Sequence, residues 1–396
     1  MATSGKRLKQ LITGQMLVSR GLKTLGKPVA WVTSGAPIEP LLAVGVIPFY
    51  PENHSAICAA KGMGAPLCQR AETMKYSRDL CSYFRVDLGS QDTGRSPFGT
   101  IPAPDLVVAS NNICGTVQNW FRIIAERHGV PFFFIDTPYS DRPPTDAELN
   151  YVEGQLRELA KKVAGLTGHR FDEAKLVKIE NNSLEALKLW ADILKFGAEK
   201  PAMFTSFEAF VYMYPIVTLR GTRWAVWFYK KLLNDIRQRQ KLGQPSVPGE
   251  RARVVWDNIA LWTRHKDMRK IFINNGIALV GDTYTNAWRS DYLDSSEPFR
   301  SMARSYMDVI LNHGPMFRVN KLISMIREYH ADGFVLHSNR SCKRWSLGAY
   351  SVKKQVSKAT GVPGLVIDGD MADPRAVSMD QVRHRLEPFF EMLTDK

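Results

Sequence analysis

Eight short apolar segments, arranged as two similar sets of four, are the feature that most constrains the fold of this chain. In each segment, Ser, Asn, Asp or Gly follows the apolar run within three residues, and the pattern of the run indicates burial on both faces. The first set is PVAWVTSG, GVIPFYPEN, DLVVASNN and VPFFFIDTPY, and the second is ARVVWDN, GIALVGDTY, DGFVLHSN and VPGLVIDGD. Such runs are typical of parallel strands that helices cover on both sides. We therefore predict an α/β fold at both ends of the chain.

The two sets match one another in order along the chain. The matched residues lie between 225 and 232 positions apart, so the spacing is nearly constant. The pairs are Trp31 and Trp256, Gly45 and Gly276, Asp105 and Asp332, and Gly129 and Gly361. A constant offset over four consecutive segments indicates an internal duplication.

The chain of 396 residues is too long for one ordinary core and suits two domains. We predict two duplicated Rossmann-like parallel-sheet domains with an N-terminal helix and a helical middle segment. The expected division is 1–27 (helix), 28–165 (first α/β domain), 166–248 (helical segment) and 249–396 (second α/β domain). Ligands of open parallel sheets bind beyond the carboxyl ends of the strands, so the site should lie in the cleft between the two domains.

The composition of the chain limits the classes of molecule that we expect it to bind. The formal net charge of +14 suits a polyanion, but the chain lacks the Cys/His spacing of zinc fingers and the aromatic motif of RNA-binding sheets. No apolar run approaches the roughly 20 residues that a membrane span needs. We therefore expect neither a nucleic-acid partner nor a membrane. Five cysteines are a sparse and odd set, which favours a reduced, cytoplasmic protein.

Two of the cysteines occupy equivalent places in the duplication. Cys114 and Cys342 both follow an apolar run in the pattern Ser-Asn-x-x-Cys, and Cys81 lies in a polar setting shortly before the first of them. Cys58 and Cys68 have the apolar surroundings of core thiols. Three converging thiols most naturally hold a metal centre, and zinc, copper(I) and iron–sulfur clusters all remain open at this point.

Several motifs together resemble the 2-hydroxyacyl-CoA dehydratase D-component family, which includes subunits of ATP-dependent benzoyl-CoA reductases. They are PVAWVTSGAPIEPLLAVGVIPFYPENHSA, YSRDLCSY, DLVVASNNICG, DGFVLHSNRSCK and IDGDMADPRAVSMDQVRHRLEPFFEML. The resemblance implies a 4Fe-4S cluster held by Cys81, Cys114 and Cys342. It also implies a homologous second subunit in a heterodimer, and a separate ATP-hydrolysing iron–sulfur activator that delivers one electron.

By this resemblance, the chain is expected to be the catalytic subunit of a dehydratase that removes water from a 2-hydroxyacyl-CoA through a ketyl radical. The close alternative is a subunit of a benzoyl-CoA reductase, in which the electrons stay in an aroyl-CoA ring. A more distant alternative is a two-lobed ligand-binding protein without catalysis. The chain contains neither G-x-G-x-x-G nor the ATP-binding G-x-x-x-x-G-K-[ST], which fits an ATPase on a separate protein.

Three residues near the first two strands are candidates for the chemistry. Ser34 is expected either to offer an oxygen ligand to the cluster or to cap the helix that begins near Pro37. Glu52 and His54 are expected to handle the departing hydroxide or a proton. The alternatives are a helix-start charge for Glu52 and an ordinary hydrogen-bonded histidine for His54.

A second group surrounds Cys342. His337 and Asn339 are expected to hydrogen-bond a cluster sulfur or, alternatively, the backbone of the turn. Arg340, Lys343 and Arg344 are candidates for contacting CoA phosphates or the electron-donor protein, or else form a solvated basic turn.

Overall fold

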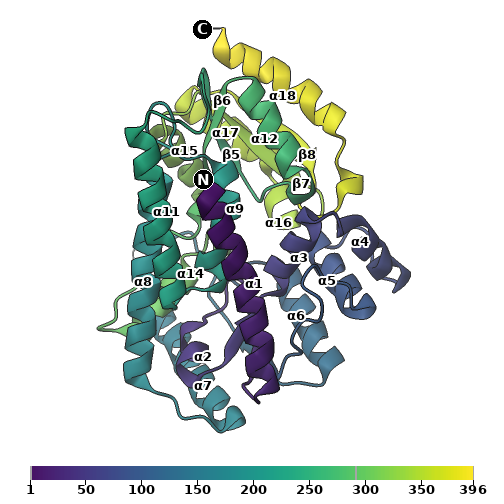
Figure 1. Ribbon diagram of the computed structural model, residues 1–396, viewed down its shortest axis with the longest axis vertical. Helices are drawn as coiled ribbons and strands as arrows, with labels where there is room; N and C mark the ends of the chain where they lie inside the picture. Colours follow the sequence, from purple (N-terminus) through teal and green to yellow (C-terminus); the bar gives the residue numbers. More distant parts are fainter. Residues whose placement is uncertain (1, 290–291, 396) are drawn as a thin grey trace.

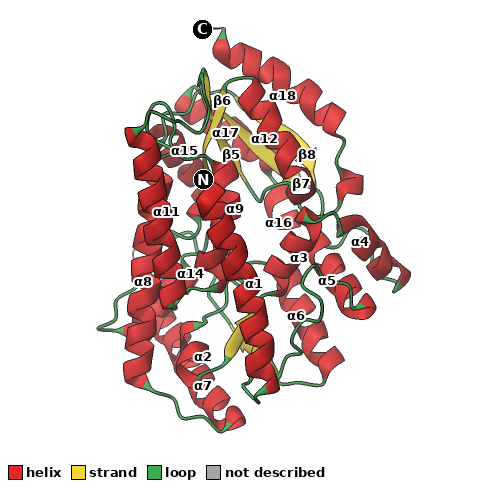
Figure 2. Ribbon diagram, viewed as in Figure 1, coloured by secondary structure: helices red, strands yellow, loops and turns green. Residues whose placement is uncertain are grey.

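The computed structural model describes residues 2–289 and 292–395, and within them it contains two four-stranded parallel sheets (Figure 2). The first sheet has the order β2-β1-β3-β4 and the second the order β6-β5-β7-β8. The strands are β1 (Val29–Val32), β2 (Ile47–Phe49), β3 (Leu106–Ser110), β4 (Phe132–Ile135), β5 (Ala252–Asp257), β6 (Ile277–Asp282), β7 (Gly333–Asn339) and β8 (Gly364–Gly369). Each strand lies in one of the eight predicted segments, so the predicted fold class is confirmed.

The two sheets repeat details of each other as well as their strand order. The carboxylate of Asp105 accepts a hydrogen bond from the backbone N–H of Val29 at 2.7 Å. The carboxylate of Asp332 accepts one from the N–H of Arg253 at 2.9 Å. In both cases an aspartate just before the third strand is bonded to the first residues of the neighbouring strand, as the duplication predicts.

Helices cover both faces of the first sheet. Val32 and Val108 face one apolar cluster, whereas Trp31 and Val107 face another, because successive side chains of a strand alternate between faces. The helices on the first side are α2 (Glu39–Val44), α7 (Asp146–Thr167) and α8 (Glu173–Lys195). Those on the second side are α3 (Pro51–Ala60), α4 (Gly64–Thr73), α5 (Ser82–Thr93) and α6 (Gly115–His128).

The second sheet is covered in the same way. Val254 and Trp256 pack with α12 (His265–Asn274) and α18 (Met379–Thr394) on one side. Val255 packs on the other side, where α15 (Pro315–Glu328) and α17 (Ala349–Thr360) lie. We call β1–β4 with α2–α6 the first lobe. The second lobe consists of β5–β8 with α12, α13 (Thr283–Asn286), α15, α16 (Lys343–Ser346), α17 and α18.

Further helices, the longest of which are α1 (Ala2–Thr24), α7, α8 and α11 (Arg223–Lys241), run beside the two lobes (Figure 1). The shorter ones are α9 (Ser206–Tyr212), α10 (Tyr214–Thr218) and α14 (Pro298–Met307). Asp235 of α11 accepts hydrogen bonds from Ser4 and Arg7 of α1 at 2.5 and 2.7 Å, which fixes the first helix to the rest. The domain boundaries stay a prediction. Among the described residues, no helix combines the length and apolar character needed to cross a bilayer.

Candidate functional site

The carboxyl ends of the two sheets share a cavity of about 160 Å³. Its walls come from the segments that follow β1, β2 and β3 in the first lobe and β5 to β8 in the second, together with α8, α10 and α14. A cavity of roughly 150 Å³ is large enough for a group the size of benzene. The cavity lies where the duplicated fold predicts a ligand site.

Cys81, Cys114 and Cys342 all line this cavity. Cys81 directly precedes α5, Cys114 directly precedes α6, and Cys342 directly precedes α16 (Lys343–Ser346). Two of the turns are joined: the N–H of Ser82 donates to Ser341 Oγ at 3.0 Å, and Ser341 Oγ donates to Ser82 Oγ at 3.1 Å. The structure therefore brings thiols of both lobes to one place.

Burial raises the pKa of all three thiols. For Cys342 it raises the pKa to about 12, with a further contribution from nearby Cys114. The pKa of Cys81 is raised by burial and then by Cys342 and Cys114. Because each thiolate would disfavour the others, the thiols are neutral unless a strongly positive group lies between them, as a metal core would.

The three cavity thiols are of the residue type that binds an iron–sulfur cluster. Among the residues that the structure describes, no group of three or more His, Cys, Asp or Glu side chains could hold one metal ion. A 4Fe-4S cluster binds each thiolate to a different iron, so its ligands need not surround one point. Asn339, three residues before Cys342, is fully buried, and neither amide atom has a hydrogen-bond partner in the described part of the chain. Asn339 does not line the cavity, so its predicted hydrogen bond to a cluster sulfur stays a prediction.

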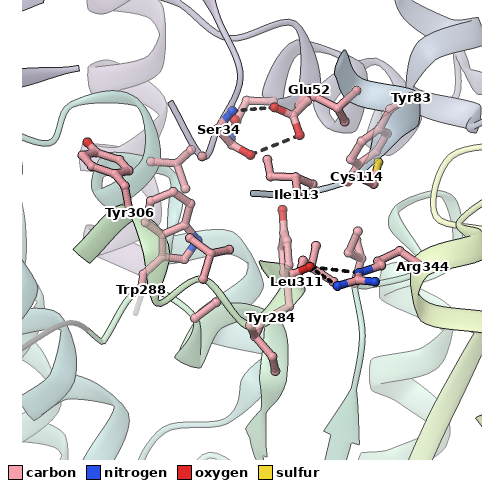
Figure 3. A pocket seen from close by; sticks show the side chains of 18 of the residues that line it. Ser34, Glu52, Tyr83, Ile113, Cys114, Tyr284, Trp288, Tyr306, Leu311 and Arg344 are labelled. Carbon is pink, nitrogen blue, oxygen red and sulfur yellow. Dashed lines mark hydrogen bonds between the residues drawn. The ribbon is translucent and has the colours of Figure 1, made fainter. Parts of the chain in front are cut away.

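Ser34 and Glu52 form a bonded pair on the cavity wall (Figure 3). The Ser34 N–H donates to Glu52 Oε2 at 2.5 Å, and Ser34 Oγ donates to Oε1 at 3.1 Å. Burial raises the pKa of Glu52 to about 7, although both bonds from Ser34 act against the shift. The alternative that Ser34 caps a helix is wrong, because α2 begins after Ile38 and has no side-chain cap.

His54 is not among the residues that line the cavity. It lies two positions after Glu52 on α3 and therefore on the opposite face of that helix. Its Nε2 is 2.9 Å from Ser96 Oγ, and burial lowers its pKa to about 4, so the ring is neutral. The geometry favours the ordinary hydrogen-bonded histidine, and we leave His54 out of the proposed chemistry.

Three further candidates around Cys342 lie outside the cavity lining: His337, Arg340 and Lys343. His337 is buried in β7, where its Nδ1 is 2.9 Å from the carbonyl oxygen of Ile259 and burial lowers its pKa. Arg340 and Lys343 are exposed, and Lys343 Nζ donates to the Arg340 carbonyl at 2.9 Å. These two cations are available to a partner molecule at the surface rather than to a group inside the cavity.

Arg344 does reach the cavity (Figure 3). Its guanidinium donates to the carbonyl of Leu311 and, at 3.0 Å, to that of His313. No carboxylate accepts from it in the hydrogen bonds of the described residues. Its positive charge therefore remains uncompensated on the wall beside Cys114, and it lowers the pKa of that thiol after the larger opposing effect of burial.

Sequence reasoning missed a buried polar cluster on the same cavity, made of Glu39, Arg220 and Tyr306. Arg220 Nε donates to Glu39 Oε1 at 3.0 Å, and Arg220 Nη2 donates to the Tyr306 hydroxyl at 2.7 Å. The Tyr306 hydroxyl in turn donates to Glu39 Oε2 at 2.5 Å. Arg220 and Glu39 are 181 positions apart, so no local pattern could have joined them.

Tyrosines of both lobes also meet at the cavity. Tyr83 of α5 and Tyr284 of α13 (Thr283–Asn286) line it, and their side chains hydrogen-bond to each other. The Trp262 Nε1 donates to the Tyr83 hydroxyl across the same lobe boundary. These contacts help to close the cavity between the lobes.

Comparison with known proteins agrees with this geometry. The family described as 2-hydroxyglutaryl-CoA dehydratase, D-component, matches residues 33–393. The chain belongs to this family. The motif resemblance found in the sequence is thereby confirmed across nearly the whole chain.

Two dehydratase subunits are among its relatives. The (R)-phenyllactyl-CoA dehydratase alpha subunit of Clostridium sporogenes is 32% identical over 94% of this chain and 91% of its own length. The (R)-2-hydroxyisocaproyl-CoA dehydratase alpha subunit of Clostridioides difficile is 31% identical over 98% of this chain and 96% of its own length.

A subunit of the benzoyl-CoA reductase of Thauera aromatica is 28% identical over 98% of this chain and 94% of its own length. The D-component family thus contains both dehydratases, which are lyases, and a reductase, which is an oxidoreductase. The expected enzyme class is confirmed at this level, and the alternative of a non-catalytic binding protein is not supported. These relatives are named as subunits, so they work in multi-subunit enzymes.

Proposed function

We propose that this chain is the catalytic subunit of an iron–sulfur dehydratase that removes water from a 2-hydroxyacyl-CoA. The observation that carries the proposal is the convergence of Cys81, Cys114 and Cys342 on one cavity between duplicated lobes, in a member of the D-component family. These three thiolates would hold a 4Fe-4S cluster. Ser34 Oγ, on the same wall, is our candidate oxygen ligand for the remaining iron.

The reaction is difficult because the β-hydrogen of a 2-hydroxyacyl thioester is not acidic and hydroxide is a poor leaving group. When bound, the cluster supplies an electron that converts the thioester carbonyl to a ketyl radical, together with a Lewis-acidic iron. The protein must then move a proton from the β-carbon to the departing hydroxide, and the substrate would give the electron back, so that an enoyl-CoA and water result.

Glu52 is the group that we assign to this proton. A carboxyl with a pKa of about 7 can take a proton and give one back near neutral pH. Ser34 holds both carboxylate oxygens in place, which orients the group toward the cavity. We place the acyl end and the thioester of the substrate in this cavity, on the side of the thiols and Glu52.

We further propose two protein partners: a homologous second subunit, with which this chain forms a heterodimer, and an ATP-hydrolysing iron–sulfur activator. The exposed cations Arg340 and Lys343 lie directly beside Cys342 and are our candidates for the activator or for the CoA phosphates. All five cysteines are free thiols, which supports a location in the reducing cytoplasm.

Anaerobic reconstitution with the second subunit and the activator tests the proposal. The complex should dehydrate at least one 2-hydroxyacyl-CoA in an ATP-dependent reaction. Glu52→Gln should lower kcat by about 10² to 10⁴, the usual contribution of a general acid–base, and should leave the iron content unchanged. Full activity of this variant would remove Glu52 from the mechanism.

A benzoyl-CoA reductase subunit is the second candidate, favoured by the similarity to the Thauera aromatica protein over nearly the full length. Electron stoichiometry separates the two. A dehydratase returns its electron after each turnover, whereas a reductase consumes electrons in proportion to product. Stoichiometric consumption of reductant with benzoyl-CoA would replace our first proposal by the second.

A further inference from the structure

The cavity has a second end, away from the thiols. Figure 3 shows Trp288 and Tyr306 on one side of the cavity, and Cys114 and Arg344 on the other. Near Trp288 and Tyr306, the lining is largely apolar. It includes Leu187 of α8, Val217 of α10 and Leu293, all of which are buried.

The cation at this second end is already neutralised. Arg220 donates to Glu39 and to the Tyr306 hydroxyl, and its guanidinium lies 5.2 Å from the centre of the Trp288 ring. Glu39 has a lowered pKa because the opposing effect of burial is outweighed by Arg220 and by hydrogen bonds such as that from Tyr306. The carboxylate is therefore ionised, and the Glu39–Arg220 pair carries no net charge.

Of the other two arginines in the described cavity lining, Arg289 is neutralised and Arg344 lies at the opposite end. Arg289 forms an ion pair with Glu328 at 2.8 Å. Arg344 donates to backbone carbonyls and lies on the side of the thiols. A negative group entering the second end would thus lose its water, meet an ionised Glu39 and find no uncompensated cation, which is strongly unfavourable.

We infer that the acyl chain of the substrate is uncharged and apolar, and does not end in a carboxylate. The inference rests on the proposed function, because it concerns the acyl chain of the same CoA thioester. Trp288 and the aliphatic side chains around it would bury that chain, and the Glu39–Arg220 pair would discriminate against acids.

Equilibrium binding tests the inference without any turnover. The probes are 4-methylpentanoyl-CoA and glutaryl-CoA, which lack the 2-hydroxyl group and have acyl chains of similar length. Isothermal titration calorimetry on the complex of this chain with its second subunit should give a Kd for 4-methylpentanoyl-CoA lower by about tenfold or more. Equal affinity, tighter binding of glutaryl-CoA or no binding of either probe would overturn the inference.

A variant locates the source of the selectivity. Glu39→Gln leaves Arg220 uncompensated, so glutaryl-CoA should gain about tenfold relative to 4-methylpentanoyl-CoA. Asp235→Asn is the matched control, because it breaks an ion pair with Arg7 outside the cavity and should leave the ratio unchanged. If Glu39→Gln folds, as judged by its thermal unfolding, and keeps the wild-type ratio, the pair is not the discriminating element. If it does not fold, the wild-type ratio still decides the inference.

Failure of this inference and failure of the proposed function would give different experimental results. A clear preference for the apolar probe in a complex that dehydrates no 2-hydroxyacyl-CoA would sustain the inference and refute the proposed reaction. Dehydration of 2-hydroxyacyl-CoA substrates with no preference between the probes would do the reverse.

Discussion

The turns that carry Cys114 and Cys342 have the same sequence pattern and the same place after the third strand of a lobe, yet their surroundings differ. In the first lobe, the Asn111 amide donates to Asp136 at 2.5 Å and accepts from the Thr137 N–H at 2.7 Å. In the second lobe, the matching Asn339 is fully buried and its amide has no partner among the described residues.

This difference separates the features that the two lobes share from those that have diverged. The strand order and the thiol positions are kept in both lobes, because the backbone fixes them. The side chains around the thiols have diverged, since Glu52 comes from the first lobe and the cation Arg344 from the second. Under our proposal, the repeated framework positions the metal ligands and the unlike surroundings provide the chemistry.

The largest expected effect is the loss of iron and turnover, which should be the same whether the cysteine of the first lobe or that of the second lobe is replaced. Cys114→Ser and Cys342→Ser should each lower iron content and reduce turnover by more than about a hundredfold, because even indirect ligand contacts cost 10- to 100-fold. Cys68 is a buried thiol outside the cavity, so the Cys68→Ala variant should keep the iron content of the wild type. Metal analysis and turnover assays measure both effects. If only one of the two variants lost iron and turnover, the cysteines of the two lobes would not be equivalent.

A second prediction contrasts buried carboxylates of the two lobes. Asp257 in the second lobe accepts from Arg318 Nε at 2.8 Å and from Thr283 Oγ1 at 2.8 Å. Asp257→Asn should destabilise the protein by about 3 to 5 kcal/mol in urea unfolding, because it leaves a buried guanidinium unpaired. A change below about 1 kcal/mol would mean that Arg318 finds another partner.

Asp87 in the first lobe has no arginine or lysine bonded to it in the described residues. Burial raises its pKa from 3.8 to about 7, although hydrogen bonds from Trp120 and Gln91 act against the shift. Between about pH 4 and 7 the folded protein keeps a proton that the unfolded chain releases. Stability should therefore fall as the pH rises through this window, and level off above it.

Urea unfolding at pH 5 and at pH 8 measures this slope. Asp87→Asn should reduce it, whereas Asp79→Asn, at an exposed position of the same lobe, should not. An unchanged slope in the Asp87 variant would assign the pH dependence to other groups.

The smallest expected effects concern Asn111 and Asn339, the asparagines at equivalent positions of the two lobes. Asn111→Ala should cost about 1 to 3 kcal/mol, because it leaves the buried Thr137 without its acceptor. Asn339→Ala removes no hydrogen bond in the described residues and should cost less than about 1 kcal/mol in iron-free protein. Urea unfolding of both variants is the measurement. Equal losses of stability in the two variants would show that the hydrogen bonding of the two asparagines does not differ.

The sequence was sufficient for the strands and for the meeting of Cys114 and Cys342, whereas Cys81 was added from its polar setting and the family resemblance. Buried parallel strands leave a strong local pattern, and the duplication then implied that equivalent strand ends face one cleft. The side of a helix is harder to predict: Glu52 and His54 are only two residues apart, yet just one of them lines the cavity. Sequence position likewise did not separate Arg344, which lines the cavity, from the exposed Arg340 and Lys343.

The cluster of Glu39, Arg220 and Tyr306 could not be predicted because its members come from three distant helical regions. Each looks ordinary in its own segment, and only the packing of α2, α14 and the turn after α10 joins them. Long-range pairs of this kind leave no periodic signal in a single sequence.

The central claim is that thiols from two duplicated lobes hold one iron–sulfur core. Iron and acid-labile sulfide analysis of this subunit, purified without oxygen, tests it most directly. Our account predicts about four iron and four sulfide atoms per chain, with Cys81, Cys114 and Cys342 protected from alkylation. A subunit without iron or sulfide, whose three cavity thiols react freely, would contradict it.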